Sequence, residues 1–233
     1  MNNLKNAGFA TKQIHVGKHD NGVGALCTPI YQTSTFEFDS VEQGGARFAG
    51  KEAGYIYSRL GNPSVAQVEE KVAALEGGEG AVCTASGMGA ISTTMWTLLA
   101  AGDEVVSASN LYGGTFSQFD AILPNAGIQV RFAPVNDIAA TEAQINEKTR
   151  LVFVETVGNP ALDVADIEAY AALAHKHGLP LVVDSTFTPP ALLRPIEHGA
   201  DIVIHSATKF LGGHGTTLGG IIVDSGKFDW AAS

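Results

Sequence analysis

The sequence predicts an α/β fold in which a mostly parallel sheet is covered by helices on both faces. From about residue 80 onward, short apolar runs alternate with helical stretches of about a dozen residues. The runs are apolar on both sides, as strands buried between two layers of helices are. The intervening stretches are long enough for the helical crossovers that parallel strands require.

The elements follow in order along the chain. The first helix is predicted to begin at Pro63-Ser64 and to end at Gly77-Gly78. Its apolar residues recur at helical spacing: Val65, Val68, Val72 and Leu75. The predicted strands are the runs GAVCTAS, EVVSA, IQVRFA, LVFVET, LPLVVDS, DIVIHSA and LGGIIVD. Further helices are predicted over 88–100, near 115–123, over 138–147 and over 165–177.

The two ends of the chain differ from this pattern. Residues 1–60 lack clear periodicity and are rich in Gly, Thr and Asn, so we expect an extended arm that lies on another body. Residues 61–233 form the expected large domain. Because the chain ends in KFDWAAS soon after an apolar run, we expect a fragment whose further domain follows Ser233, with a natural tail as the alternative.

Composition excludes several classes of protein. Of 233 residues, 14 are Lys or Arg and 24 are Asp or Glu, and the resulting charge of −10 argues against a nucleic-acid partner. Cys27 and Cys83 are too few for a disulfide framework and indicate reduced thiols in a cytoplasmic protein. The longest apolar stretch, residues 91–101, is interrupted by Ser and Thr and is too short for a membrane span.

Polar residues directly follow several predicted strands. Ser86-Gly87-Met88-Gly89 follows the first, Gly158-Asn159-Pro160 the fourth and Asp184 the fifth, while Ser206, Thr208 and Lys209 follow the sixth. Ligands of open parallel sheets bind outside the carboxyl ends of the strands. We therefore expect these groups to share one site.

The helix start at Ser86-Gly87-Met88 is a candidate anion site. Free backbone N–H groups and the positive end of the helix dipole favour an anion there, and glycine lets a phosphate approach closely. An ordinary strand-to-helix turn is the alternative. The segment also resembles the beginning of G-x-G-x-x-G, but Ser92 stands at the third glycine and disfavours a nicotinamide dinucleotide.

Asp184 and Lys209 are the candidate reactive groups. A carboxylate after a run of buried aliphatic residues needs a cationic partner such as a protonated pyridine nitrogen, unless Asp184 only caps the next segment. A lysine in a partly desolvated pocket can act as a Schiff-base nucleophile, whereas most lysines simply lie at the surface.

Two other types of site are disfavoured. Ser206-Ala207-Thr208-Lys209 matches the S-x-x-K motif of serine β-lactamases, but S-D-N and K-T-G elements are missing and the α/β pattern differs. A metal site is not expected, because His175 and His177 point to different faces of a helix and the other histidines lack ligand spacing.

A phosphate cradle, a carboxylate for a pyridine nitrogen and a Schiff-base lysine together match pyridoxal phosphate. From about Thr11 onward the sequence resembles the Cys/Met-metabolism pyridoxal-phosphate enzymes of fold type I. The motifs that carry the resemblance are TPIYQTSTF, YIYSRLGNPS, SGMGAIS, LYGGTF, ETVGNP, VVDSTF and SATKFLGGHG. It implies an aspartate-aminotransferase-like large domain and a C-terminal domain, absent from this chain, that supplies the arginine for the substrate carboxylate.

The resemblance also implies a role for each matching residue. Lys209 would form the Schiff base and move protons, Asp184 would pair with the pyridine nitrogen, and Asn159 would bind the ring oxygen. Tyr112 would stack on the ring. The phosphate would be held by the helix start and by hydroxyl groups: Ser86, Gly87, Met88, Ser206 and Thr208. Tyr57 and Arg59 would reach the phosphate site of a neighbouring subunit in a homotetramer, a dimer of dimers.

The subfamily is less sharply indicated. Methionine γ-lyases carry a cysteine just after LYG, where this chain has Gly114, and LYGGTF and GGHGTTLGGIIVDSGKFDW resemble O-acetylhomoserine sulfhydrylases. We therefore expect γ-replacement on O-acetylhomoserine by sulfide through a vinylglycine intermediate. SRLGNPS and SGMGAISTTMWTLL are equally similar to methionine γ-lyase, so γ-elimination, as in methionine or cystathionine γ-lyases, is the alternative. A truncated, inactive piece is a third possibility.

Overall fold

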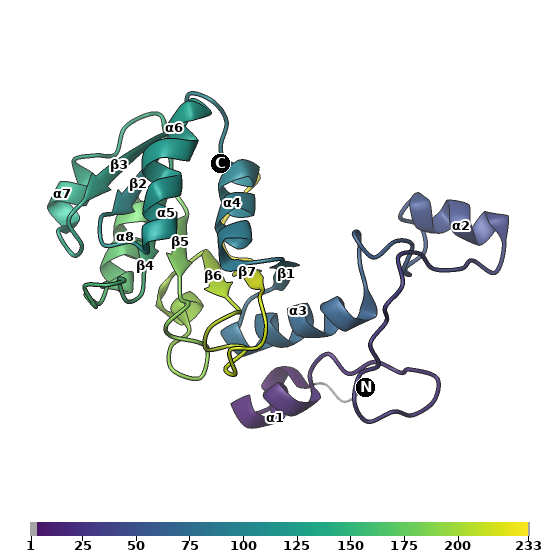
Figure 1. The fold of residues 1–233 in the computed structure, drawn as a ribbon. Helices are drawn as coiled ribbons and strands as arrows, with labels where there is room; N and C mark the ends of the chain where they lie inside the picture. The colour runs from purple at the N-terminus through teal and green to yellow at the C-terminus, as the bar shows by residue number, and fades with distance from the viewer. Residues whose placement is uncertain (1–3, 233) are drawn as a thin grey trace. The chain divides into compact units, whose positions relative to one another are not determined.

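The computed structural model describes residues 4–232, which divide into two units, one up to Val72 and one from Ala73 onward (Figure 1). The N-terminal unit contains the 3-10 turn η1 (Leu4–Asn6), α1 (Phe9–His15) and α2 (Val41–Phe48). The helix α3 (Pro63–Glu76) begins in this unit and continues into the next. Long irregular segments join the helices of the N-terminal unit.

The short helices α1 and α2 were not predicted, because seven and eight residues are too few to establish a helical period. A local signal for α2 is nevertheless present in the sequence. The Ser40 hydroxyl accepts the Gln43 N–H at 3.1 Å, and the Gln43 side chain accepts the Asp39 N–H at 2.7 Å. Such reciprocal capping satisfies two N–H groups at a helix start and stabilises a helix of only two turns.

The C-terminal unit contains a seven-stranded sheet with the strand order β1-β7-β6-β5-β4-β2-β3. The strands are β1 (Gly80–Thr84), β2 (Glu104–Ala108), β3 (Gln129–Ala133), β4 (Thr149–Glu155), β5 (Leu181–Asp184), β6 (Ile202–Ser206) and β7 (Gly220–Asp224). β7 runs antiparallel to both of its neighbours, and the other four pairs are parallel. The prediction of a mostly parallel sheet is confirmed.

Helices cover the sheet between the strands. They are α4 (Gly87–Leu98), α5 (Gly113–Ser117), the π-helical turn η2 (Gln118–Ile122), α6 (Leu123–Asn125), α7 (Ile138–Glu142), α8 (Ile167–Lys176) and the 3-10 turn η3 (Pro195–His198). α7 ends five residues before its predicted end. Among the described residues, no helix has the length and apolarity needed to cross a bilayer.

The core shows why the central strands are apolar on both sides. Leu151 and Phe153 of β4 belong to a cluster with residues of α4 and η2, and the Phe153 and Phe119 rings meet edge to face with centroids 5.0 Å apart. Val152 and Val154 are fully buried as well. Since alternate strand residues point to opposite faces, they face the other layer, where α8 contacts β4 and β5.

Candidate functional site

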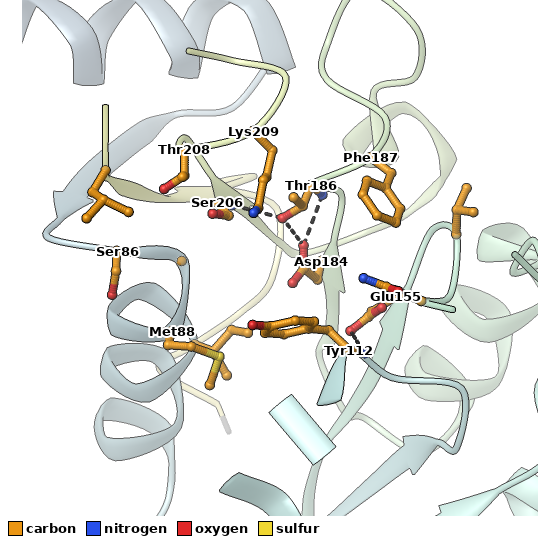
Figure 2. A pocket seen from close by; sticks show the side chains of 15 residues that line it. Ser86, Met88, Tyr112, Glu155, Asp184, Thr186, Phe187, Ser206, Thr208 and Lys209 are labelled. Carbon is orange, nitrogen blue, oxygen red and sulfur yellow. Dashed lines mark hydrogen bonds between the residues drawn. The ribbon is translucent and has the colours of Figure 1, made fainter. Parts of the chain in front are cut away.

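A cavity of about 330 Å³ lies in the C-terminal unit at the carboxyl ends of β4, β5 and β6, next to the start of α4 (Figure 2). Its lining consists of Ser86, Gly87, Met88, Ile91, Tyr112, Glu155, Val157, Asn159, Asp184, Thr186, Phe187, Ser206, Thr208, Lys209 and Leu218. This is the edge at which the sequence placed its candidate residues.

The first turn of α4 forms one wall. Ser86 is the N-cap, and its hydroxyl accepts the Gly89 N–H at 3.0 Å. The N–H groups of Gly87 and Met88 have no acceptor within the helix, because they lie in its first turn. A Cβ atom at position 87 would lie 2.5 Å from the Cβ of Ser206, so only glycine lets the helix start approach this strand end. The result is a cradle for a small anion.

Asp184, the last residue of β5, lies at the centre of the pocket. Its Oδ1 accepts the Thr186 N–H at 2.9 Å and the Thr186 hydroxyl at 2.6 Å. Oδ2 has no hydrogen-bond partner anywhere in residues 4–232. Burial raises the pKa of this carboxyl group, and the hydrogen bonds from Thr186 offset only part of that effect. A cationic N–H donor at Oδ2 would stabilise the charged form.

Lys209 follows β6 by three residues, and its side chain points into the cavity toward Asp184 (Figure 2). Within the described part of the chain, the Lys209 amine forms neither a hydrogen bond nor an ion pair. Lysine side chains in proteins usually extend into water, so an unpaired amine that lines a cavity beside a buried carboxyl group is a candidate nucleophile.

Tyr112 and Glu155 form the opposite side. The Tyr112 ring lies across the cavity from Lys209 and is half exposed (Figure 2). The Tyr112 backbone N–H donates to Oε1 of Glu155 at 2.7 Å. Burial, and after it the charge of Asp184, raise the pKa of Glu155 to about 8. Glu155 was not predicted from the sequence, although it directly follows the buried run LVFV just as Asp184 follows LPLVV.

The predicted residues of the C-terminal unit come together in this pocket. They are Ser86, Gly87, Met88, Tyr112, Asn159, Asp184, Ser206, Thr208 and Lys209. Tyr57 and Arg59 belong to the N-terminal unit, where the Arg59 guanidinium lies 5.5 Å from the centroid of the Tyr57 ring. Their expected approach to a neighbouring subunit stays a prediction. Thr186, the hydrogen-bond partner of Asp184, was not predicted from the sequence either.

The sequence was compared with those of known protein families. The model of the Cys/Met metabolism PLP-dependent enzymes, where PLP is pyridoxal phosphate, matches residues 10–233. The chain belongs to this family. The resemblance read from the motifs, and the pyridoxal-phosphate cofactor that it implied, are thereby confirmed.

Individual relatives carry different activities. The chain is 50% identical over 228 residues to an L-methionine gamma-lyase of Porphyromonas gingivalis, which covers 97% of this chain and 57% of that protein. It is 49% identical over 224 residues to a homocysteine synthase of Schizosaccharomyces pombe, covering 95% and 52%. The chain therefore spans little more than half the length of these curated relatives.

A solved structure shows the same fold with the cofactor attached. It is a Campylobacter jejuni protein assigned to the O-acetylhomoserine (thiol)-lyases, crystallised with N'-pyridoxyl-lysine-5'-monophosphate. The TM-score is 0.92 at 34% identity, over 96% of this chain and 55% of that one. The type I fold predicted from the resemblance is thus confirmed.

The pocket of this chain fits the polar groups of pyridoxal phosphate. The open oxygen of Asp184 matches a protonated ring nitrogen, since a buried carboxylate needs a cationic donor. The free N–H groups of Gly87 and Met88, with the hydroxyl groups of Ser206 and Thr208, match a phosphate. The amine of Lys209 is suited to form a Schiff base with the aldehyde group of the cofactor.

Proposed function

We propose that this chain contributes the cofactor pocket of an enzyme that replaces the γ-substituent of an O-acylhomoserine. One observation carries the proposal: a buried carboxyl group with an open oxygen, an unpaired lysine and an uncapped helix start line one cavity. When bound there, pyridoxal phosphate supplies an electron sink that acidifies the Cα–H bond of an amino acid.

The residues of the pocket divide the work. Asp184 keeps the ring nitrogen protonated, the N–H groups of Gly87 and Met88 bind the phosphate, and the Lys209 amine takes the Cα proton. The hydroxyl groups of Ser206 and Thr208 add donors for the phosphate. Asn159 binds the ring oxygen, and the Tyr112 ring packs against the cofactor.

The reaction we favour uses O-acetylhomoserine and hydrogen sulfide and gives homocysteine and acetate. The Cγ–O bond breaks as acetate leaves, and a Cγ–S bond forms. Gly114 supports this choice over methionine cleavage, because a Cβ at this position would lie 2.6 Å from Cε1 of Tyr112 and 3.3 Å from Sδ of Met88. The cysteine expected of methionine γ-lyases would therefore displace the Tyr112 ring.

γ-Elimination is the second candidate, and the 50% identity to an L-methionine gamma-lyase favours it. The holoenzyme should be assayed with O-acetylhomoserine plus sulfide and, in parallel, with L-methionine alone. Homocysteine from the first mixture at a rate at least tenfold above methanethiol release from the second supports replacement. The reverse ratio overturns it in favour of elimination.

We further propose that the enzyme is a homo-oligomer in which Tyr57 and Arg59 complete the phosphate site of a neighbouring subunit. An arginine there would form charge-assisted hydrogen bonds to the phosphate. Mixing inactive Arg59→Ala and Lys209→Ala chains tests this, because one site of each mixed dimer then contains both native residues. Activity should reappear on mixing, whereas a mixture as inactive as its components rules out a contribution from the neighbour.

A further inference from the structure

Glu155 is a buried acid next to Asp184 to which neither the motifs nor the proposed reaction assigns a role. We propose that Glu155 is a positioning residue that joins the two cofactor-binding segments of the pocket, one carrying Tyr112 and the other Asn159. The inference rests on the proposed function, because it concerns how the pocket holds pyridoxal phosphate.

The fold places Glu155 where two segments meet. It is the last residue of β4, only 5% exposed, and it stands in register with Asp184 on the adjacent strand β5. Its Oε1 accepts the Tyr112 N–H at 2.7 Å, at the point where the chain turns from β2 into α5. Glu155 therefore fixes the backbone from which the Tyr112 ring projects into the cavity (Figure 2).

The second segment runs from β4 to α8. Asn159 follows Glu155 by four residues, and its backbone N–H, after that of Tyr112, partly offsets the rise in the pKa of the Glu155 carboxyl group. The neighbouring Gly158 packs directly on Asn110, since a Cβ at 158 would overlap the Asn110 Nδ2. The segments that carry Tyr112 and Asn159 thus touch, and Glu155, which leads from β4 into the Asn159 segment, binds the backbone N–H of Tyr112.

The surroundings of Glu155 explain why an acceptor, and not merely bulk, matters here. Asp184 faces it from β5, and Tyr112 and Lys209 line the same cavity. Burial and the charge of Asp184 disfavour a charged Glu155, whereas the two backbone donors favour it. A hydrocarbon side chain would avoid the first two costs but would leave the Tyr112 N–H without its acceptor.

The test compares Glu155→Gln, which keeps an acceptor oxygen, with Glu155→Ala, which lacks one. Glu104→Gln is the matched control, because Glu104 is also a buried strand-terminal glutamate but begins β2 at the opposite edge. The readouts are the dissociation constant of pyridoxal phosphate, from fluorescence titration, and the visible circular dichroism of the cofactor at saturation. The dichroism reports the asymmetry that the Tyr112 ring imposes.

We expect Glu155→Ala to weaken cofactor binding about tenfold or more and to lose most of the dichroism. Glu155→Gln should stay within about threefold of the wild type, and Glu104→Gln should be unchanged. Equal binding and equal dichroism in the alanine and wild-type holoenzymes overturn the inference. A wild-type protein that binds no pyridoxal phosphate would instead refute the proposed function.

Hydrogen exchange of the wild-type holoenzyme decides the matter if the alanine chain does not fold. The Tyr112 amide should exchange at least about tenfold more slowly than the adjacent Gly113 amide, which begins α5 and has no acceptor in its own helix. Equal exchange of the two amides contradicts the proposal.

Discussion

Two buried glutamates, one at the amino end of a strand and one at the carboxyl end of another, have pKa values shifted in opposite directions. Glu104 begins β2 and Glu155 ends β4, and both are buried. Hydrogen bonds from Arg131, and then from Asn146, lower the pKa of Glu104 to about 2. Burial and the charge of Asp184 raise the pKa of Glu155 to about 8.

Two buried aspartates at the same two ends of the strands differ in their hydrogen bonds. Asp201 directly precedes β6, and its Oδ2 accepts the Leu181 N–H and contacts His175 Nε2, both at 2.8 Å. Asp184 ends β5 with an oxygen that has no partner within residues 4–232. At the amino ends of the strands, Glu104 and Asp201 thus have hydrogen-bond partners within the protein. At the carboxyl ends, an oxygen of Asp184 is left without a partner among the described residues. Perturbed, open acids of this kind mark a ligand site.

The largest effect should come from removing Lys209, the proposed nucleophile, at the carboxyl ends of the strands. Lys209→Ala should reduce turnover by about a thousandfold or more, because both the attachment point and the proton carrier are lost. Borohydride treatment followed by peptide mass analysis should attach the cofactor to the Lys209 peptide in the wild type only. Attachment to another lysine in the wild type would reassign the site.

The next largest effect compares the two aspartates. Asp184→Asn should weaken pyridoxal-phosphate binding by about 10- to 100-fold, since a neutral amide cannot pair with a protonated ring nitrogen as a carboxylate does. Asp201→Asn should leave that binding unchanged and instead lower the free energy of unfolding by about 1–3 kcal/mol. Equal loss of cofactor affinity in both variants would contradict the proposal that only Asp184 binds the cofactor.

A smaller effect is expected from filling the cradle. Gly87→Ala places a methyl group 2.5 Å from the Cβ of Ser206, so the start of α4 must move away from β6. We expect the affinity for inorganic phosphate and for the cofactor to fall about tenfold. Gly80→Ala, where a Cβ meets nothing within 4 Å, is the control and should bind both normally.

The last prediction concerns how the free energy of unfolding depends on pH. The two glutamates should contribute to this dependence with opposite signs. The pKa of Glu104 is lowered in the folded state, so its contribution is present above pH 4.5 and is lost as the pH falls toward 2. The pKa of Glu155 is raised, so its contribution is present below pH 4.5 and is lost as the pH rises through about 8.

Thermal unfolding of the apoprotein measures both. From pH 4.5 to 8, Glu155→Gln should gain on the order of 4 kcal/mol relative to the wild type, because it no longer has a carboxyl group to ionise in a buried site. Glu104→Gln should be about 1 kcal/mol less stable than the wild type near pH 6, and the gap should close in acid. If the stability of both variants relative to the wild type changed with pH in the same way, the two glutamates would not differ as proposed.

Much of this architecture was predictable from sequence, because strands buried on both faces leave uninterrupted apolar runs such as LVFVE and DIVIH. The direction of β7 was not predictable from its apolar pattern, which is the same for either direction. The structure shows that no helix separates β6 from β7, and the strand accordingly runs antiparallel.

The site was predictable for the same topological reason. Polar residues that follow parallel strands lie at the same end of the sheet, so the sequence alone predicts that Asp184 and Lys209 share one site. Applied consistently, the rule also selects Glu155. Strand order says nothing about Tyr57 and Arg59, because they lie in the unit that contains no strand of the sheet. Their proposed roles depend on the family resemblance alone.

The pairing of β1 with β7 has a consequence for how the protein is made. Gly80 pairs with Asp224, so the first strand of the C-terminal unit awaits a partner synthesised more than a hundred residues later. At about 5–20 residues per second, a ribosome needs on the order of ten seconds to supply it. Until then β1 and β6 are not joined in one sheet, because β7 lies between them, and closing so long a loop comes late. We therefore expect the cofactor to bind only after the whole sheet has been translated.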